Sequence, residues 1–372
     1  MRRLIYIFII GLLLCSYTWA DGSRYASNSL LSEGKWVKIR VDKTGIYKLS
    51  YADLKNMGFS DPSKVSVHGY GGWPLDEDFS KEYIDDVPST PVWRGSDYLL
   101  FYGKGPVKWE YDSSSQTFVH TNNPYSLYGY YFVTDATPTN DMTSVAQASG
   151  ASTRITTYDD YLLHEQELVS VNQSGREFFG EDFSGARPRT ISTFSSIPGI
   201  TDADGKVTMR FISRINSGSG TASLSINDSE LLDITIPSIQ TVSSNVRSYT
   251  KAIPGTTTAL WKGSKSEKNN VVVSYSSSGH TNVRLDYIRM QFVRTLRPYG
   301  ACTFFRSLTS VGNASRFVIS EANSNTLVFD VTDALNVKRV EADLNGSELS
   351  FTIPAGRLRE FVLVQTNQTF PS

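Results

Sequence analysis

Short segments in which apolar and polar residues alternate, separated by turn dipeptides, recur along the second half of the chain. An alternation with a period of two is typical of strands that bury one face, and regular spacing of such strands is typical of a sandwich. The segments are residues 206–212, 222–226, 271–275, 283–292, 316–320, 326–331, 337–344 and 361–365. We therefore expect residues 185–372 to form an antiparallel, jelly-roll-like β-sandwich, with a sub-boundary near residue 298 left open.

The first half of the chain predicts another β-rich domain, over residues 21–136. Its expected strands alternate in the same way, and residues 35–50 are interpreted as a hairpin. Ser50 is a good helix N-cap and Gly58 a good stop, so a short helix is expected over residues 51–57. The other expected strands cover residues 65–68, 98–102, 107–111, 117–120 and 128–134.

Residues 137–184, between these two domains, are predicted to be a linker or extended segment. Residues 137–152 are rich in Thr, Ser, Ala and Asn and show no periodicity, which favours a loop. The leucines of residues 158–169 fit either a helix or an extended arm, and the pattern does not decide between them.

The first twenty residues predict a secretory signal peptide. Arg2 and Arg3 precede an apolar stretch, and small residues at positions 18 and 20 favour cleavage after Ala20. The apolar stretch is short for a membrane anchor, and a lipoprotein would need a small residue before Cys15, where Leu14 stands. We therefore expect an exported protein, and no later segment is apolar enough to cross a membrane.

Composition argues against several classes of function. The net charge is −1 and no run of Lys and Arg occurs, so no nucleic-acid partner is predicted. Removal of the signal peptide leaves Cys302 as a single thiol, which cannot form an internal disulfide. The four histidines, at positions 68, 120, 164 and 280, show no metal-ligand spacing, and no cofactor is predicted.

Cys302 and two acidic pairs are the residues to weigh as sites. Cys302 could be a nucleophile, but no local base accompanies it, and a small core residue is the favoured interpretation. Asp202 and Asp204 are weak calcium candidates, because alternating carboxylates can share a cation; a hairpin turn explains them better. Asp330 and Asp333 have the same two interpretations.

The remaining clusters favour structural roles. Residues 69–72 are glycine-rich but lack the lysine of a phosphate loop, so they predict a turn. The adjacent carboxylates at 85–86 and 159–160 would point to opposite faces of a strand, which does not build an acid/base pair. A sugar-stacking platform is the alternative to core packing for the many aromatic residues: Trp36, Trp73, Trp93, Trp109, Trp261, Tyr128, Tyr130 and Tyr131.

Five longer segments are more specific than these clusters. They cover residues 36–58, 125–134, 175–183, 285–296 and 329–333, and Gly175-Arg-Glu-Phe-Phe-Gly-Glu-Asp-Phe183 is the strongest. In this order they resemble the N-terminal region of the PorU-like sortases, gingipain-family cysteine peptidases of the type IX secretion system in Bacteroidetes. The resemblance spans residues 33–366 and so nearly the whole chain after the signal peptide.

The resemblance implies a setting at the outer membrane, in the periplasm or at the cell surface. Such sortases remove the C-terminal sorting domain of type IX cargo and help attach the cargo to lipopolysaccharide. A cysteine and a histidine do this chemistry in a caspase-like α/β domain that follows the region seen here. Cys302 and His280 lie within the β region and match no catalytic motif of the family, so no catalytic residue is carried over.

The first hypothesis is therefore a non-catalytic N-terminal portion of a PorU-like sortase, inactive on its own. It would support a cysteine peptidase domain that is missing from this chain, or engage outer-membrane components of the type IX system. The alternative is a secreted β-sandwich module that binds surface glycan such as lipopolysaccharide, and a third possibility is a purely structural adaptor.

Overall fold

The computed structural model describes residues 25–78, 80–81, 84–171, 175–185, 187–215, 218–239, 252–278 and 281–370. The predicted signal peptide, with Cys15, and His280 lie outside these residues. The mainly β fold is confirmed, because nearly all described elements are strands. Within these ranges no helix has the length and apolar character needed to cross a bilayer. The helical elements are α2 (Tyr51–Asn56), η1 (Leu30–Ser32), η2 (Pro62–Lys64), η3 (Ser192–Phe194) and η4 (Leu308–Ser310).

The N-terminal part, residues 25–134, packs two small sheets around one core. One sheet has the order β1 (Val37–Val41), β9 (Gly129–Thr134), β3 (Ser66–His68) and β4 (Ser89–Thr90). The other has the order β2 (Gly45–Ser50), β6 (Tyr98–Gly103) and β5 (Val92–Arg94). Leu54 of α2 is buried between them, and Ser50 Oγ caps the helix by accepting from the Asp53 amide at 3.0 Å, as the sequence predicts.

The predicted hairpin over residues 35–50 is wrong, although both of its strands exist. β1 pairs with β9 and β2 pairs with β6, so the chain crosses from one sheet to the other at residues 42–44. Val37, Ile39 and Val41 of β1 reach the N-terminal core from one sheet, and Tyr47 and Leu49 of β2 reach it from the facing sheet. The Tyr47 hydroxyl holds this corner by donating to the Lys43 carbonyl at 2.7 Å.

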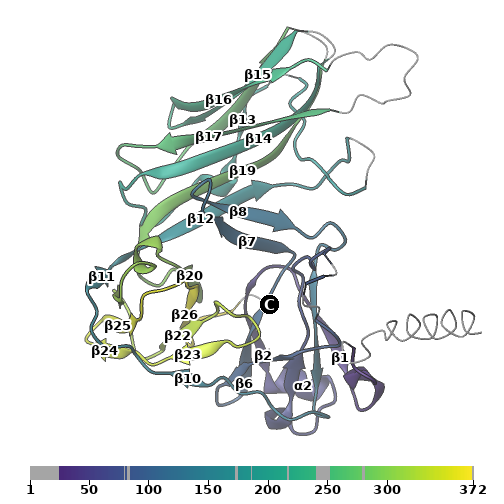
Figure 1. Cartoon of the computed structure of the whole chain (residues 1–372), viewed down its shortest axis with the longest axis vertical. Coiled ribbons are helices and arrows are strands. Elements are labelled where there is room, and N and C mark those ends of the chain that lie inside the picture. Colours follow the sequence, from purple (N-terminus) through teal and green to yellow (C-terminus); the bar gives the residue numbers. More distant parts are fainter. Residues whose placement is uncertain are drawn as a thin grey trace, which may run out of the picture.

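A separate hairpin, β7 (Val107–Asp112) and β8 (Thr117–Asn122), is confirmed at the position predicted for it. Asp112 holds its turn, because its carboxylate accepts from the amides of Ser114 and Ser115 at 3.0 and 3.3 Å. The hairpin extends from the N-terminal part into the middle of the molecule (Figure 1).

The first sandwich encloses the largest of the buried apolar clusters. One sheet has the order β12 (Thr157–Glu165), β19 (Thr281–Thr295), β14 (Gly205–Ile215) and β17 (Ile253–Trp261). The facing sheet has the order β13 (Arg189–Thr190), β18 (Val271–Ser277), β15 (Ser219–Ile226) and β16 (Ser229–Pro237). The undecided segment 158–169 therefore begins as a strand, antiparallel to β19.

The second sandwich follows β19. One sheet has the order β10 (Ser144–Val145), β23 (Lys338–Val340), β22 (Thr326–Asp330), β26 (Phe361–Gln365) and β20 (Cys302–Phe305). The other has the order β11 (Thr153–Ile155), β21 (Ser315–Ile319), β25 (Glu348–Ile353) and β24 (Asp343–Asn345). Residues after 185 thus form two sheet pairs, which meet between β19 and β20, and residues 144–165 of the predicted linker or extended segment add β10, β11 and β12 to them. The domain boundaries given above stay predictions.

The N-terminal part packs directly on the second sandwich. Ile46, Leu100 and Tyr102, on β2 and β6, share a buried cluster with Val362 and Val364 of β26. Figure 1 shows the result: the first sandwich lies at the top, the second at the lower left and the N-terminal part at the lower right. The β7–β8 hairpin lies between these three bodies.

Gly71, in an N-terminal turn, and Gly346, in the turn between β24 and β25, differ in how tightly their surroundings are packed. Gly71 has a φ of +84°, and a Cβ there would lie 2.7 Å from Tyr131 Oη and 2.8 Å from the Lys104 carbonyl oxygen. Gly346 has a φ of +61° with nothing within 4 Å. We expect Gly346→Ala to cost about 1 kcal/mol of unfolding free energy from backbone strain alone. Gly71→Ala should cost about 3 kcal/mol or more, measured by urea denaturation, because a clash is added. Equal losses would contradict the packing described here.

Candidate functional site

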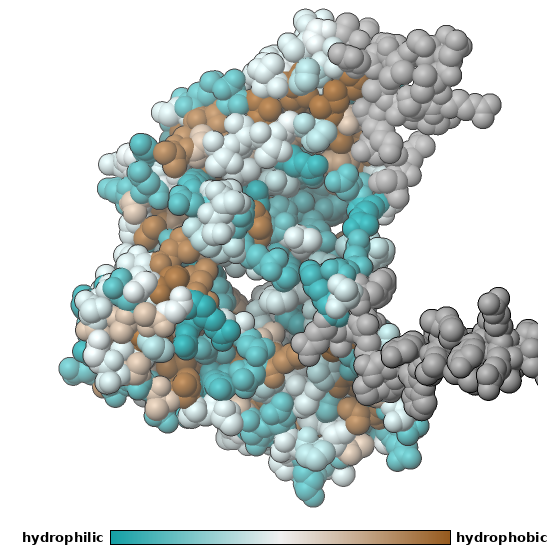
Figure 2. Space-filling model, viewed as in Figure 1, coloured by the Kyte–Doolittle hydropathy of each residue, from teal (hydrophilic) through white to brown (hydrophobic). Residues whose placement is uncertain are grey.

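Two hollows lie on either side of the β7–β8 hairpin. The central cavity, of about 660 Å³, lies between the hairpin, β12, the start of the second sandwich and the corner at residues 42–44. The groove, of about 1210 Å³, lies between the hairpin, the loop 74–77, residues 176–178 and the surface of the first sandwich. Figure 2 shows the surface hollowed in this middle region. Both hollows are candidate sites.

Arg306 is the most deeply buried charge at the central cavity, with 2% of its side chain exposed. Its Nε and Nη2 both donate to the Glu360 carboxylate, and Nη1 donates to the Asp159 carbonyl at 2.9 Å. Burial acts to lower the pKa of Arg306, but Glu360, Tyr161 and Asp160 together outweigh it and hold that pKa well above its ordinary value. The guanidinium is therefore a permanent, paired charge.

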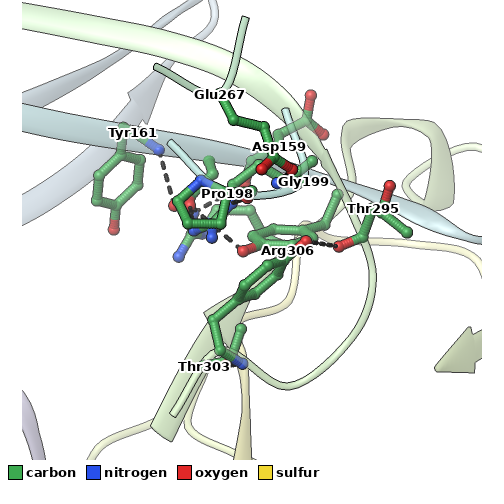
Figure 3. A network of polar contacts seen from close by, with 12 residues as sticks. Asp159, Tyr161, Pro198, Gly199, Glu267, Thr295, Thr303 and Arg306 are labelled. Carbon is green, nitrogen blue, oxygen red and sulfur yellow. Dashed lines mark hydrogen bonds and ion pairs between the residues drawn. The ribbon is translucent and has the colours of Figure 1, made fainter. Parts of the chain in front are cut away.

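A second arginine secures the same end of β12. Arg294 Nη1 donates to Asp160 at 2.8 Å, and its Nε donates to the Pro198 carbonyl at 2.8 Å. Its guanidinium lies 3.8 Å from the centre of the Tyr299 ring, whose hydroxyl donates to Thr295. Figure 3 shows these polar contacts around Arg306 and the ends of β12 and β19.

Aromatic stacking attaches the hairpin to this network. Trp109 of β7 stacks on Tyr161 of β12 with ring centres 4.0 Å apart and an interplanar angle of 17°. The Arg306 guanidinium lies 4.3 Å from the Tyr161 ring centre. The Gln291 side chain bonds both the amide and the carbonyl of Phe118 in β8, at 2.9 and 3.1 Å. Three bodies of the fold are thus tied together around one buried cation.

Cys302 lies on the wall of the central cavity, where it is half-buried and packed in the cluster between β2 and the second sandwich. Burial raises the pKa of its thiol to about 12, which keeps it protonated at neutral pH. No histidine is among the described residues that line this cavity. The geometry therefore supports the core interpretation of Cys302.

The weak calcium candidates lie in turns. Asp202 is exposed and accepts from the Lys265 amide at 2.8 Å, and both Asp202 and Asp204 attract the Lys265 ammonium. Asp330 accepts from the Thr332 amide at 3.1 Å. Over the described ranges, no three His, Cys, Asp or Glu side chains gather as a metal would require. Calcium at these positions stays a prediction.

The glycine cluster and the carboxylate pairs also hold the backbone. Gly69 and Gly71 have positive φ values of 138° and 84°, in agreement with a turn. Asp86 accepts from the Leu30 amide at 2.6 Å and so binds the N-terminal segment. Asp159 accepts from the Leu308 amide at 2.7 Å, whereas Asp160 binds Arg294.

The aromatic candidates do not form one platform. Trp109 and Trp73 line the central cavity, but Trp261 is buried in the first sandwich and Tyr131 in the N-terminal core. On the outer face of β1 and β9, Lys38 lies over Tyr130 and Arg40 over Tyr128, at 3.9 and 4.3 Å from the ring centres. Most of these rings therefore have partners within the chain.

The groove holds polar residues that the sequence did not single out. His120 Nε2 lies 3.2 Å from a Glu165 oxygen, and Arg210 is paired with Asp286. Burial raises the pKa of Asp286 to about 6 in spite of Arg210. These residues come from β8, β12, β14 and β19, which no local pattern brings together. Only Asp286 belonged to a segment singled out in the sequence, at 285–296.

A solved structure similar to this chain is the crystal structure of dimeric latent PorU from Porphyromonas gingivalis. The TM-score is 0.81 and the sequence identity 33%, over 93% of this chain and 33% of PorU. The chain thus spans about a third of the length of that protein.

Two other structures are similar only at TM-scores too low to support an argument. CBM35 from Cellvibrio japonicus Abf62 has a TM-score of 0.17 and 15% identity, over 37% of this chain and 97% of that one. The insecticidal delta-endotoxin Cry8Ea1 from Bacillus thuringiensis has a TM-score of 0.20 and 10% identity, over 61% of this chain and 42% of that one. No protein-family model and no curated protein matches the chain.

The Arg306–Glu360 pair yields a prediction about stability. In Glu360→Gln the buried Arg306 charge loses its counter-ion, and we expect a loss of about 3 kcal/mol in unfolding free energy. The matched control is Glu321→Gln, which removes the charge facing the more exposed Arg297 and should cost roughly 0–1 kcal/mol. Urea denaturation measures both. Similar small losses would show that the Arg306 network does not hold the fold.

Cys302 yields a prediction about reactivity. A pKa of about 12 leaves on the order of one thiol in 10⁴ ionised at about pH 8. In the chain that starts at Asp21, where Cys302 is the only cysteine, we expect iodoacetamide to react on the order of 10³-fold more slowly than in concentrated guanidinium. Mass spectrometry follows the reaction. Fast alkylation of the folded chain would mean an activated thiol and contradict a structural role.

Proposed function

Because this chain is PorU-like over 93% of its length, we propose that it works as a non-catalytic N-terminal portion of a type IX secretion sortase. In this role it supports a cysteine peptidase domain on a separate or longer polypeptide. The observation that carries the proposal is the extent of the similarity: 33% identity at a TM-score of 0.81, over a third of PorU.

The contacts inside the chain support a platform better than an active site. Cys302 has a raised pKa and no histidine beside it among the described cavity residues. The charged groups at the centre, Arg306, Glu360, Arg294 and Asp160, are paired with one another. Paired charges of this kind orient bodies relative to each other, which is what a supporting portion has to do for its partner.

The proposal places the protein outside the cytoplasm, in the periplasm or on the outer membrane, with type IX components as its partners. The signal peptide predicted from the sequence and the likeness to PorU both support this location. The glycan-binding alternative stays a prediction; it draws no support from an aromatic platform, since the rings lie in separate cores and surfaces.

The test supplies the peptidase domain of a PorU-like sortase as a separate polypeptide. We expect it to form a one-to-one complex with the chain from residue 21 onward in size-exclusion chromatography with light scattering. The chain alone should cleave no type IX sorting-domain substrate, and Cys302→Ala should change nothing. Failure to form the complex would contradict the supporting role. Cleavage by the chain alone that Cys302→Ala abolishes would contradict its non-catalytic character.

A further inference from the structure

Large apolar side chains stand exposed around the groove. Tyr125 is 80% exposed, Leu127 67%, Leu75 51% and Phe178 36%, and all four line the same hollow. They come from three loops that are far apart in the sequence. Single exposed apolar residues are common on protein surfaces, but several around one hollow are typical of an interaction site.

The interior of the groove is acidic. Asp286 is buried, the Glu165 side chain is 9% exposed, and Glu167 is exposed. Glu165 pairs with His120, and Glu167 accepts from the Asn122 side-chain amide at 2.8 Å. The third carboxylate, Asp286, is paired with the guanidinium of Arg210. Arg210 is shared with Glu177, at 3.7 Å, so its charge only partly offsets the three carboxylates.

These carboxylates disfavour one another's charge. Burial raises the pKa of Glu167, and the nearby Glu165 raises it further. Burial also raises the pKa of Asp286, and Glu165 and Glu167 add to this effect. A cation placed among the three would relieve the repulsion between them.

Charge is unbalanced over the whole groove. Eight carboxylates and four Lys or Arg side chains line it, an excess of four negative charges. The entire chain carries a net charge of only −1. The excess is thus local, and it complements a basic partner.

Three of the five segments that carry the resemblance to PorU-like sortases meet in this groove. Residues 125–127, 176–178 and 286–287 belong to the segments 125–134, 175–183 and 285–296, and all line it. Among the described residues, the core of the first sandwich contains parts of two of these segments, through Phe183 and Leu285. The most specific parts of the sequence therefore share one surface.

We propose that the groove binds an extended peptide segment of a partner protein, in which a Lys or Arg side chain is followed by an apolar one. The cation would lie among Glu165, Glu167 and Asp286, and the apolar side chain would pack on Tyr125, Leu127 and Phe178. The apolar rim favours a peptide over a small polyamine or a divalent cation, which would leave those side chains in water. This inference rests on the proposed function for its setting, since it names the chemistry of a partner of the same chain.

The experiment titrates the chain from residue 21 onward into three fluorescent peptides, read by anisotropy. The first alternates Arg with Leu and Phe, the second keeps the Arg residues but replaces the apolar ones by Ser, and the third replaces Arg by Glu. We expect the first to bind and the other two to bind at least about tenfold more weakly. Equal binding of the first two peptides would show that the apolar side chains contribute nothing and would overturn the proposal. Displacement of the first peptide by millimolar Ca²⁺ or spermidine would show that the groove binds a small cation instead, and would also overturn it.

Variants locate the binding. Glu167→Gln and Leu127→Ser, both at exposed positions of the groove, should each weaken binding of the first peptide by about five- to tenfold. Glu230→Gln and Leu344→Ser, exposed on β16 and β24 and outside the groove, are the matched controls and should leave it unchanged. Binding that all four variants leave intact, or weaken alike, would overturn the site. If the chain binds the first peptide but forms no complex with the peptidase domain, only the sortase proposal is contradicted. If it forms that complex but does not bind the peptide, only this inference is contradicted.

Discussion

Arg306 leaves β20 at the point where the hairpin, the first sandwich and the second sandwich meet, and its guanidinium is almost fully withdrawn from water. A buried charge is tolerated only where counter-ions and hydrogen bonds replace its hydration. Here Glu360 comes from the second sandwich, the Asp159 carbonyl from the first, and Tyr161 carries the contact on to Trp109 of the hairpin. Any other arrangement of these bodies would leave the charge unpaired, so the pairing selects one arrangement.

That arrangement also creates the two hollows. Because Trp109 and Gln291 hold the hairpin against β12 and β19, it divides the middle of the molecule into the central cavity and the groove. The buried charges of the cavity, Arg306 and Arg294, are paired within the chain with Glu360 and Asp160, which suits a structural centre. The groove instead combines unbalanced acidic groups with exposed apolar side chains, which suits a surface for another molecule. A platform that carries a partner site is consistent with a portion of a PorU-like protein.

The sequence predicts local structure well and the long-range contacts poorly. Alternation and turn residues locate the β7–β8 hairpin, the helix after Ser50 and several sandwich strands, among them β14, β15, β18, β19 and β26. The strands β16, β17, β20 and β25 were not predicted. The pairing of β1 with β9 could not be predicted from the sequence. The turn residues 42–44 have the same sequence features whether the chain turns back within one sheet or crosses to another sheet. Arg306 carries no local signal at all, since its partners lie 54 and 147 residues away. The sequence did not predict the groove; it only singled out three of the segments that line it, as parts of the family resemblance.

The claim that these three β bodies form one fixed platform is tested most directly by small-angle X-ray scattering of the chain from residue 21 onward. The account predicts that the scattering profile of the native chain fits the arrangement in Figure 1, and that it does so in both low and high salt. It further predicts that Glu360→Gln gives a larger radius of gyration or a profile that only a mixture of arrangements fits. A native profile that requires bodies moving independently would contradict the account.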